Sequence, residues 1–275
     1  MKRIGFVLHS ERSVISEVLE EFQRVCTDQG IESFEYTDSS DAPDVVIVLG
    51  GDGTILRTCE LVIGTDIPIL GFNLGRVGFL AQAHPTSISQ TINRLKLNQF
   101  NIEERSLAEV IVLRDRSSVY NSFALNEVSV EKDHSDIMIE LKHFINDTVL
   151  TAWAGDGVIV ATPSGSTAYA FSAGGPIVFP NVSCLVMVPI CAHALFAKPI
   201  VFSMDSKYRV QVHSDAGILN LDGRRTFHLE YLDDVIVTGS DEKIRFIRFD
   251  DTDFTERLVQ KFRLPTIGWR ETHDA

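Results

Sequence analysis

The stretch VVIVLGGDGTILRT, residues 45–58, joins a run of apolar residues to three glycines that surround one aspartate. The apolar run is rich in β-branched residues, which is typical of a parallel strand covered on both faces. Residues 55–63 can then form a helix, and residues 67–73 (IPILGFN) predict a second buried strand. A strand, a glycine turn, a helix and another strand in this order indicate an open α/β domain.

The same alternation continues on both sides of this stretch. Residues 3–9 predict a strand, and apolar residues between positions 14 and 26 recur at helical spacing before a glycine stop. A further helix is expected to begin at Pro85. We therefore expect residues 1–100 to form an α/β domain with an open parallel sheet and the glycine loop.

The pattern changes after residue 100. Short β-rich segments such as 122–130 (SFALNEVSV) follow one another between turn residues, which predicts an all-β domain over residues 101–250. One helix is expected inside it at STAYAFSAGG, residues 166–175, with Gly174 as its stop. Residues 251–275 have a mildly helical pattern, and we expect them to pack back on the first domain.

Composition limits the classes of ligand. The formal net charge of −13 argues against a nucleic-acid partner, because the phosphate backbone would be repelled. The apolar runs are shorter than the ~20 residues of a membrane helix, and no signal-peptide pattern opens the chain, so we expect a cytoplasmic protein without a membrane segment. Four cysteines without a Cys-x-x-Cys pair favour neither a disulfide framework nor a zinc knuckle.

The glycine loop has the composition of a phosphate site. Ligands of open α/β sheets bind beyond the carboxyl ends of the strands, and glycines let the backbone approach a phosphate closely. We therefore expect Gly50, Gly51, Gly53 and Thr54 to form a phosphate loop. Asp52 has the wrong charge for binding phosphate, but it can orient the hydroxyl that attacks a phosphorus atom. The alternative is a structural aspartate that caps the following helix.

Several longer motifs narrow the class. GGDGT is shared by NAD kinases, by diacylglycerol and sphingosine kinases and, more distantly, by phosphofructokinases. The further blocks are GFNLGRVGFLA (71–81), LNEVSV (125–130), DGVIVATPSGSTAYAFSAGGPIV (156–178), PICAHALFAKPIV (189–201) and LDGRR (221–225). Their order and spacing resemble those of the NAD kinase family over nearly the whole chain. The resemblance implies the α/β fold of phosphofructokinases and NAD kinases, followed by an all-β NAD-binding domain.

The resemblance also implies an activity. NAD kinases transfer the γ-phosphoryl group of ATP to the 2′-hydroxyl of the adenosine ribose of NAD, which gives NADP. The resemblance implies that Asp52 is the proton acceptor and that Gly50, Gly51, Gly53 and Thr54 lie along the ATP phosphates. The NAD-binding positions that it implies are Asp52, Gly53, Arg57, Asn126, Glu127, Asp156, Thr167, Ala168, Tyr169, Ala170, Phe171 and Ser172. A divalent cation such as Mg²⁺ would arrive with ATP, its protein ligands unassigned, and the chain would form a homodimer or homotetramer.

Residue chemistry is compatible with these roles and with simpler ones. The Asn126 side chain has both a donor and an acceptor for an adenine edge, and the Glu127 carboxylate can accept from ribose hydroxyls. The same pair can also be a turn at the end of a strand, and the 167–172 run can be a capped helix with Tyr169 and Phe171 in the core. His193 is expected to be a buried structural histidine.

Two other functions compete with the kinase of NAD. A lipid kinase of the diacylglycerol type shares GGDGT, but it would not be expected to contain LNEVSV or the long block at 156–178, and the sequence shows no basic amphipathic surface for a membrane. A non-catalytic sensor of NAD(H) could retain the fold. The presence of Asp52 favours an enzyme over such a sensor.

Overall fold

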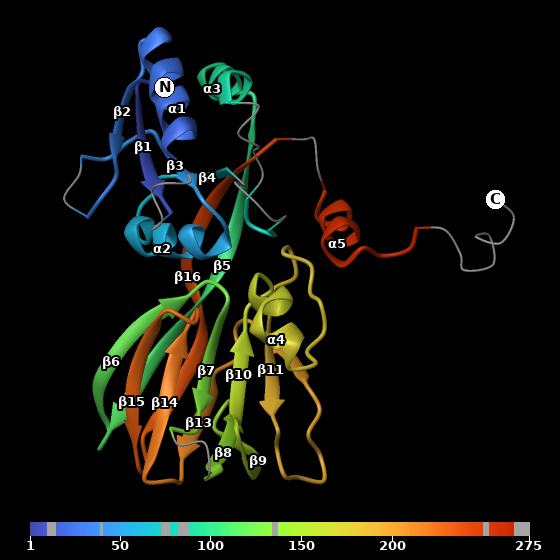
Figure 1. Cartoon of the computed structure of the whole chain (residues 1–275). Helices are drawn as coiled ribbons and strands as arrows, with labels where there is room; N and C mark the ends of the chain where they lie inside the picture. Colours follow the sequence, from blue (N-terminus) through green and yellow to red (C-terminus); the bar gives the residue numbers. More distant parts are fainter. Residues whose placement is uncertain are drawn as a thin grey trace, which may run out of the picture. The chain divides into compact units, whose positions relative to one another are not determined.

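The computed structural model describes residues 1–9, 15–38, 41–72, 78–81, 88–133, 137–249 and 253–266. The chain divides into two compact units (Figure 1), the first made of Met1–Glu104 with Ile244–Ala275 and the second of Arg105–Lys243. The limits at residues 100 and 250 that we expect from the sequence stay predictions. Within the described residues, no helix is long and apolar enough to cross a membrane.

The first unit is an α/β domain. Its strands are β1 (Arg3–Leu8), β2 (Glu32–Glu35), β3 (Val45–Leu49) and β4 (Ile69–Phe72), and its helices are α1 (Ser16–Asp28), α2 (Asp52–Val62), α3 (Ile88–Lys96) and α5 (Phe254–Phe262). The strands pair in the order β2-β1-β3-β4, all parallel, and Phe246 of strand β16 (Asp234–Arg248) pairs in parallel with Ile69. The predicted open parallel sheet is therefore confirmed.

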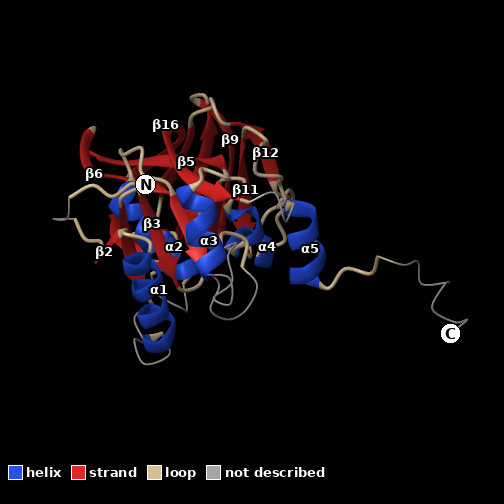
Figure 2. Ribbon diagram, turned by 90° about the horizontal axis from the view of Figure 1, so that it is seen from above, coloured by secondary structure: helices blue, strands red, loops and turns tan. Residues whose placement is uncertain are grey.

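Strand β3 explains why the sequence is uniformly apolar there. All five of its residues are buried, because helices cover both faces of the sheet. Side chains of α1 and α3 share a core with Val45, Ile47 and Leu49, whereas α2 packs its Ile55 against Gly71, which faces the other way along β4. Figure 2 shows α1, α2 and α3 grouped around β3 from above.

The boundaries differ in detail from the sequence prediction. Helix α2 begins at Asp52, three residues before the predicted start, because Gly51 is the N-cap and Asp52, Gly53 and Thr54 already belong to the first turn of the helix. Strand β2 was not predicted, since its sequence ESFE lacks an apolar pattern. The predicted helix start at Pro85, and residues 73–77 of the GFNLGRVGFLA block, lie outside the described residues.

The second unit is a β-sandwich. Its strands are most of β5 (Asn101–Arg114), β6 (Ser117–Ala124), β7 (Glu127–Glu131), β8 (Ile139–Ile145), β9 (Thr148–Gly155), β10 (Gly157–Ala161), β11 (Cys184–Ile190), β12 (Ile200–Ser203), β13 (Tyr208–Val212), β14 (Ala216–Leu221), β15 (Arg225–Glu230) and most of β16. One antiparallel sheet has the order β12-β11-β10-β7-β14-β15, and another contains β16-β13-β8-β9. Inward side chains of both sheets form one core, which confirms the all-β prediction.

The predicted helix at residues 166–175 is wrong in extent. It consists of a 3₁₀ turn, η3 (Gly165–Thr167), and a four-residue helix, α4 (Tyr169–Ser172), because Ala168 between them has a non-helical backbone. Gly174 has a φ of +87°, so the predicted glycine stop is confirmed.

Candidate functional site

Asp52 lies at the first position of α2, at the carboxyl end of β3. The N-cap position is Gly51, which is extended, so the hypothesis that Asp52 caps the helix in that position is wrong. The Asp52 carboxylate instead accepts hydrogen bonds from the backbone N–H groups of Phe79 at 3.1 Å and Leu80 at 3.3 Å. Two peptide groups from a distant segment therefore fix the carboxylate at the end of the sheet.

The three glycines of the loop differ in the space available for a side chain. A Cβ at Gly50 would lie 2.8 Å from the Cβ of Thr54, so the first turn of α2 leaves no room for a side chain there. A Cβ at Gly51 or Gly53 would meet no described atom within 4 Å. The last two positions thus leave the backbone open to a ligand.

Two arginines hold the segment that binds Asp52. Arg248, at the end of β16, donates to the carbonyl of Leu80 at 2.9 Å, and Arg257 of α5 donates to the carbonyl of Phe79 at 3.4 Å. Burial lowers the pKa of Arg257, and the charge of Arg248 lowers it further. Sequence reasoning missed both arginines, because neither belongs to a motif and both act through main-chain atoms.

The Arg57 side chain lies, like Asp52, at the carboxyl end of the parallel strands. Its Nη2 atom donates to the carbonyl of Leu8, the last residue of β1, at 2.5 Å. The guanidinium is half-buried there, one turn of α2 beyond Gly53. Its contact with a pyrophosphate stays a prediction.

Asn126 and Glu127 form a buried turn between β6 and β7. Asn126 is 9% exposed and Glu127 is 7% exposed, which is unusual for side chains of these types. A Cβ at Gly165 would lie 2.7 Å from the Cα of Asn126, so η3 packs directly on this turn. The structure therefore brings the LNEVSV and GSTAY blocks together within the second unit.

The charge state of Glu127 is perturbed. Burial raises its pKa most, the charges of Asp222 and Glu131 add to the rise, and a hydrogen bond from the Tyr169 backbone N–H opposes them, so that the pKa lies at about 8. The Glu127 Oε2 atom has no hydrogen-bond partner among the described residues. A buried acid with a raised pKa and an open oxygen is typical of a functional site.

Asp156 and Tyr169 belong to the same neighbourhood. The Asp156 carboxylate pairs with Lys132 Nζ at 2.6 Å, and hydrogen bonds from Lys132 and Cys191 lower its pKa. The Tyr169 hydroxyl donates to Glu131 at 3.2 Å, and burial and the charge of Glu131 raise its pKa to about 12. The charge of Asp156 also contributes to that shift.

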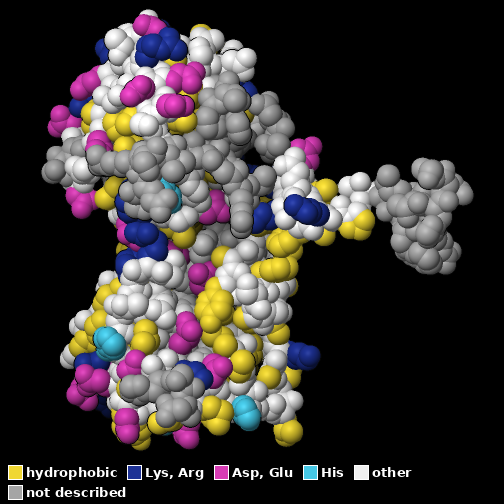
Figure 3. All heavy atoms as spheres, viewed as in Figure 1, with side chains coloured by type: hydrophobic (Ala, Val, Ile, Leu, Met, Phe, Trp, Pro, Cys, Tyr) yellow, Lys and Arg dark blue, Asp and Glu magenta, His cyan; other side chains and the backbone are white. Residues whose placement is uncertain are grey.

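The 167–172 run is more exposed than expected. Ala170 is fully buried, Thr167 and Ala168 are half-buried, and Ser172 is exposed. Tyr169 and Phe171 are 38% and 39% exposed, so the alternative that places them in the core is wrong. His193 is also exposed, which corrects its prediction as a buried residue. Figure 3 shows further hydrophobic side chains on this face of the second unit.

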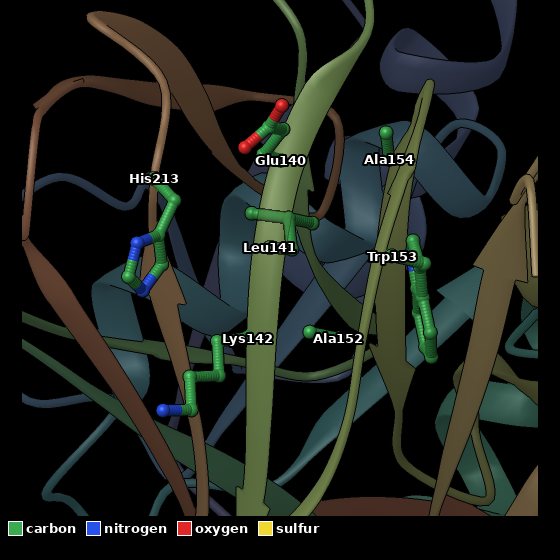
Figure 4. A pocket seen from close by; sticks show the side chains of 7 residues that line it. All are labelled: Glu140, Leu141, Lys142, Ala152, Trp153, Ala154 and His213. Carbon is green, nitrogen blue, oxygen red and sulfur yellow. The ribbon is translucent and has the colours of Figure 1, made fainter.

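A pocket of about 340 Å³ lies elsewhere in the second unit. Figure 4 shows residues 140–142 on β8 beside residues 152–154 on β9, with His213 across from them. None of the predicted site residues lines it. No group of three or more His, Cys, Asp or Glu side chains that could hold a metal occurs in the described parts of the chain.

An α/β unit with a GGDGT turn, followed in the chain by a β-sandwich with a buried Asn-Glu turn, defines a class of phosphotransferases. The description "ATP-NAD kinase N-terminal domain" matches residues 4–99, and "ATP-NAD kinase C-terminal domain" matches residues 125–249. This chain belongs to the NAD kinase family.

Individual relatives agree with this membership. The NAD kinase of Bifidobacterium longum (strain DJO10A) is 44% identical over 236 residues, which cover 84% of this chain and 69% of the relative. NAD kinase 2 of Streptomyces coelicolor is 45% identical over 232 residues, with coverages of 84% and 77%.

Solved structures share the fold. An NAD kinase from Archaeoglobus fulgidus in complex with ATP has a TM-score of 0.78 at 26% identity, over 97% of this chain and 100% of that one. Yeast NADH kinase complexed with NADH has a TM-score of 0.88 at 22% identity, over 98% of this chain and 89% of that one.

Proposed function

We propose that this protein is an ATP-dependent kinase of NAD. The ribose 2′-oxygen forms a bond to the γ-phosphorus of ATP, the bond from that phosphorus to the bridging oxygen breaks, and ADP leaves. The observation that supports the proposal best is that the family match extends over both units. The position of Asp52 at the start of α2, beside two glycines open to a ligand, agrees with it.

The catalytic role falls to Asp52. Its carboxylate, held by two backbone N–H groups, orients the ribose hydroxyl and accepts its proton late, when the bond to phosphorus has largely formed. Gly50, Gly51, Gly53 and Thr54 lie along the ATP phosphates. A fixed carboxylate is suited to this task, because aiming the nucleophile contributes more than strong basicity.

The NAD-binding role falls mainly to the second unit. Asn126 and Glu127 contact the nucleoside. Both side chains are buried, and the Glu127 Oε2 atom, which has no hydrogen-bond partner among the described residues, would select a ligand group that can bond to it. The remaining proposed contacts are Gly53, Arg57, Asp156, Thr167, Ala168, Tyr169, Ala170, Phe171 and Ser172. Helix α4 has only four residues and is too short to bind an anion through its N-terminus. Its proposed contacts with NAD are therefore made by its side chains and by the path of its backbone.

The proposed setting of the reaction is cytoplasmic, with the chain acting as a homodimer or homotetramer. Mg²⁺ takes oxygen ligands and binds through substrate phosphates with one or two carboxylates at most. Asp52 is a carboxylate of the required type next to the phosphate loop, so the residues present fit a cation that arrives with ATP. Such a cation would neutralise phosphate charge.

The test is product formation by the wild-type protein. The protein is incubated with ATP, Mg²⁺ and NAD, and NADP is followed with an NADP-specific dehydrogenase. We expect NADP to accumulate with ATP consumption. Phosphorylation of diacylglycerol in a parallel reaction, without NADP, would identify a lipid kinase instead, and NAD binding without turnover would identify a sensor.

A further inference from the structure

Asp222 is a buried acid at the turn between β14 and β15. Its φ of +54° places it in the left-handed region, which aspartate tolerates better than most residues. Its Oδ1 atom accepts from the N–H groups of Asn126 at 2.7 Å and Glu127 at 3.3 Å, and Oδ2 accepts from Leu125 at 3.1 Å. One carboxylate thus binds three successive peptide groups of the Asn-Glu turn.

The turn is also held from other sides. Arg225 Nη2 donates to Asp222 at 3.1 Å and to the carbonyl of Phe123 at 2.6 Å, which ties the carboxylate to β6. Thr162 donates its hydroxyl to the carbonyl of Leu125 at 2.5 Å and its N–H to the carbonyl of Asn126 at 2.8 Å. These hydrogen bonds fix the main chain of the turn. They therefore also fix the positions from which the side chains of Asn126 and Glu127 extend.

We propose that Asp222 is a positioning residue for NAD, which holds the Leu125–Glu127 turn so that Asn126 and Glu127 meet the dinucleotide. The proposal rests on the proposed function and deepens it, since it assigns a task to the LDGRR block. A carboxylate that accepts several backbone N–H groups forms charge-assisted hydrogen bonds, which are roughly twice as strong as neutral ones. An amide at the same position has one acceptor oxygen and cannot serve all three donors.

The charge of Asp222 has a second effect. It raises the pKa of Glu127, after burial, and Glu131 on β7 acts in the same direction. The Tyr169 backbone N–H of α4 acts against it, and Arg225 faces Asp222 rather than Glu127. Neutralising Asp222 therefore lowers the pKa of Glu127, so the ionised acceptor forms at a lower pH. A loss of packing alone would not produce this shift.

The experiment compares Asp222→Asn with a matched control, Asp233→Asn. Asp233 is a buried acid as well. It pairs with Arg114 at 2.8 Å and accepts from the N–H of Glu230 at 2.9 Å, but its turn lies between β15 and β16. For Asp222→Asn we expect the KM for NAD to rise about 10-fold or more, with the KM for ATP unchanged within twofold. The rise of kcat/KM for NAD with pH moves to lower pH. Asp233→Asn is expected to lower the melting temperature and leave both KM values unchanged.

Equal changes in KM for NAD in the two variants, or an unchanged KM and pH profile in Asp222→Asn, would overturn the proposal. If Asp222→Asn does not fold, Arg225→Lys is tested in its place. Lysine keeps the positive charge beside Asp222 but loses the guanidinium that bonds both to the Asp222 carboxylate and to the carbonyl of Phe123. It is expected to raise the KM for NAD without moving the pH profile, and no rise would overturn the proposal. Absence of NADP from the wild type would instead refute the proposed function.

Discussion

Gly78 offers a sharp test of how Asp52 is held. A Cβ added at this position would lie 2.7 Å from the Cγ and 2.8 Å from the Oδ2 of Asp52. The optimal separation of non-bonded heavy atoms is about 3.5–4.0 Å. In Gly78→Ala the Asp52 carboxylate or the segment that contains residue 78 must therefore move by roughly 1 Å. The hydrogen bonds from Phe79 and Leu80, already 3.1 and 3.3 Å long, cannot both survive that movement.

The expected loss follows from this displacement. A 1 Å error in the placement of a reacting group costs on the order of 10²-fold in rate, so kcat for NADP formation should fall by about that factor. The assay is steady-state NADP production at saturating ATP and NAD, together with the melting temperature. Gly217→Ala is the control, because its Cβ would lie 2.8 Å from the flexible Cδ1 of Ile139 in the second unit. A Gly78→Ala enzyme that is folded and within about threefold of wild-type kcat would refute the reasoning.

Two further predictions concern the buried charges. Arg257→Met removes the donor to the carbonyl of Phe79. We expect kcat to fall by roughly 10-fold, with an unchanged KM for NAD. An unchanged kcat would show that α5 does not position Asp52. Glu127 has a folded-state pKa of about 8, above its ordinary value, so the folded protein holds a proton that the unfolded chain has lost. The free energy of unfolding should therefore fall as the pH rises from about 4.5 to about 8, by up to about 1.4 kcal/mol per pH unit. Urea unfolding of Glu127→Gln should lack this component, and identical slopes in both proteins would contradict it.

The sequence predicts the elements whose signals are local. The apolar run of β3 marks a strand buried on both faces, and Gly174 ends α4 as a residue with positive φ should. The 166–175 helix fails because tertiary contacts override its propensity. The Ser166 hydroxyl accepts from the N–H of Val178 at 2.9 Å and donates to Pro163 at 2.7 Å, which stabilises a 3₁₀ turn in place of a regular helix.

The site could be predicted only as far as its motifs extend. Asp52 and the Asn126–Glu127 pair are marked by their neighbours in the chain. The groups that hold these side chains are not marked in the sequence, because they are far away along the chain. Phe79 is 27 residues from Asp52, and Asp222 is 96 residues from Asn126. Both contacts run through backbone N–H groups, which every residue except proline provides. No residue type at a fixed spacing could have revealed them.

The role of Asp52 is the central claim, and Asp52→Asn tests it most directly. The amide keeps the size of the side chain and one acceptor for the N–H groups of Phe79 and Leu80, but it cannot accept the hydroxyl proton. The measurement is the rate of NADP formation from ATP, Mg²⁺ and NAD by wild type and variant, beside the Kd for NAD of each. We predict a rate lower by ~10²-fold or more in the variant, with an unchanged Kd. Equal rates would contradict the account and leave Asp52 a structural residue.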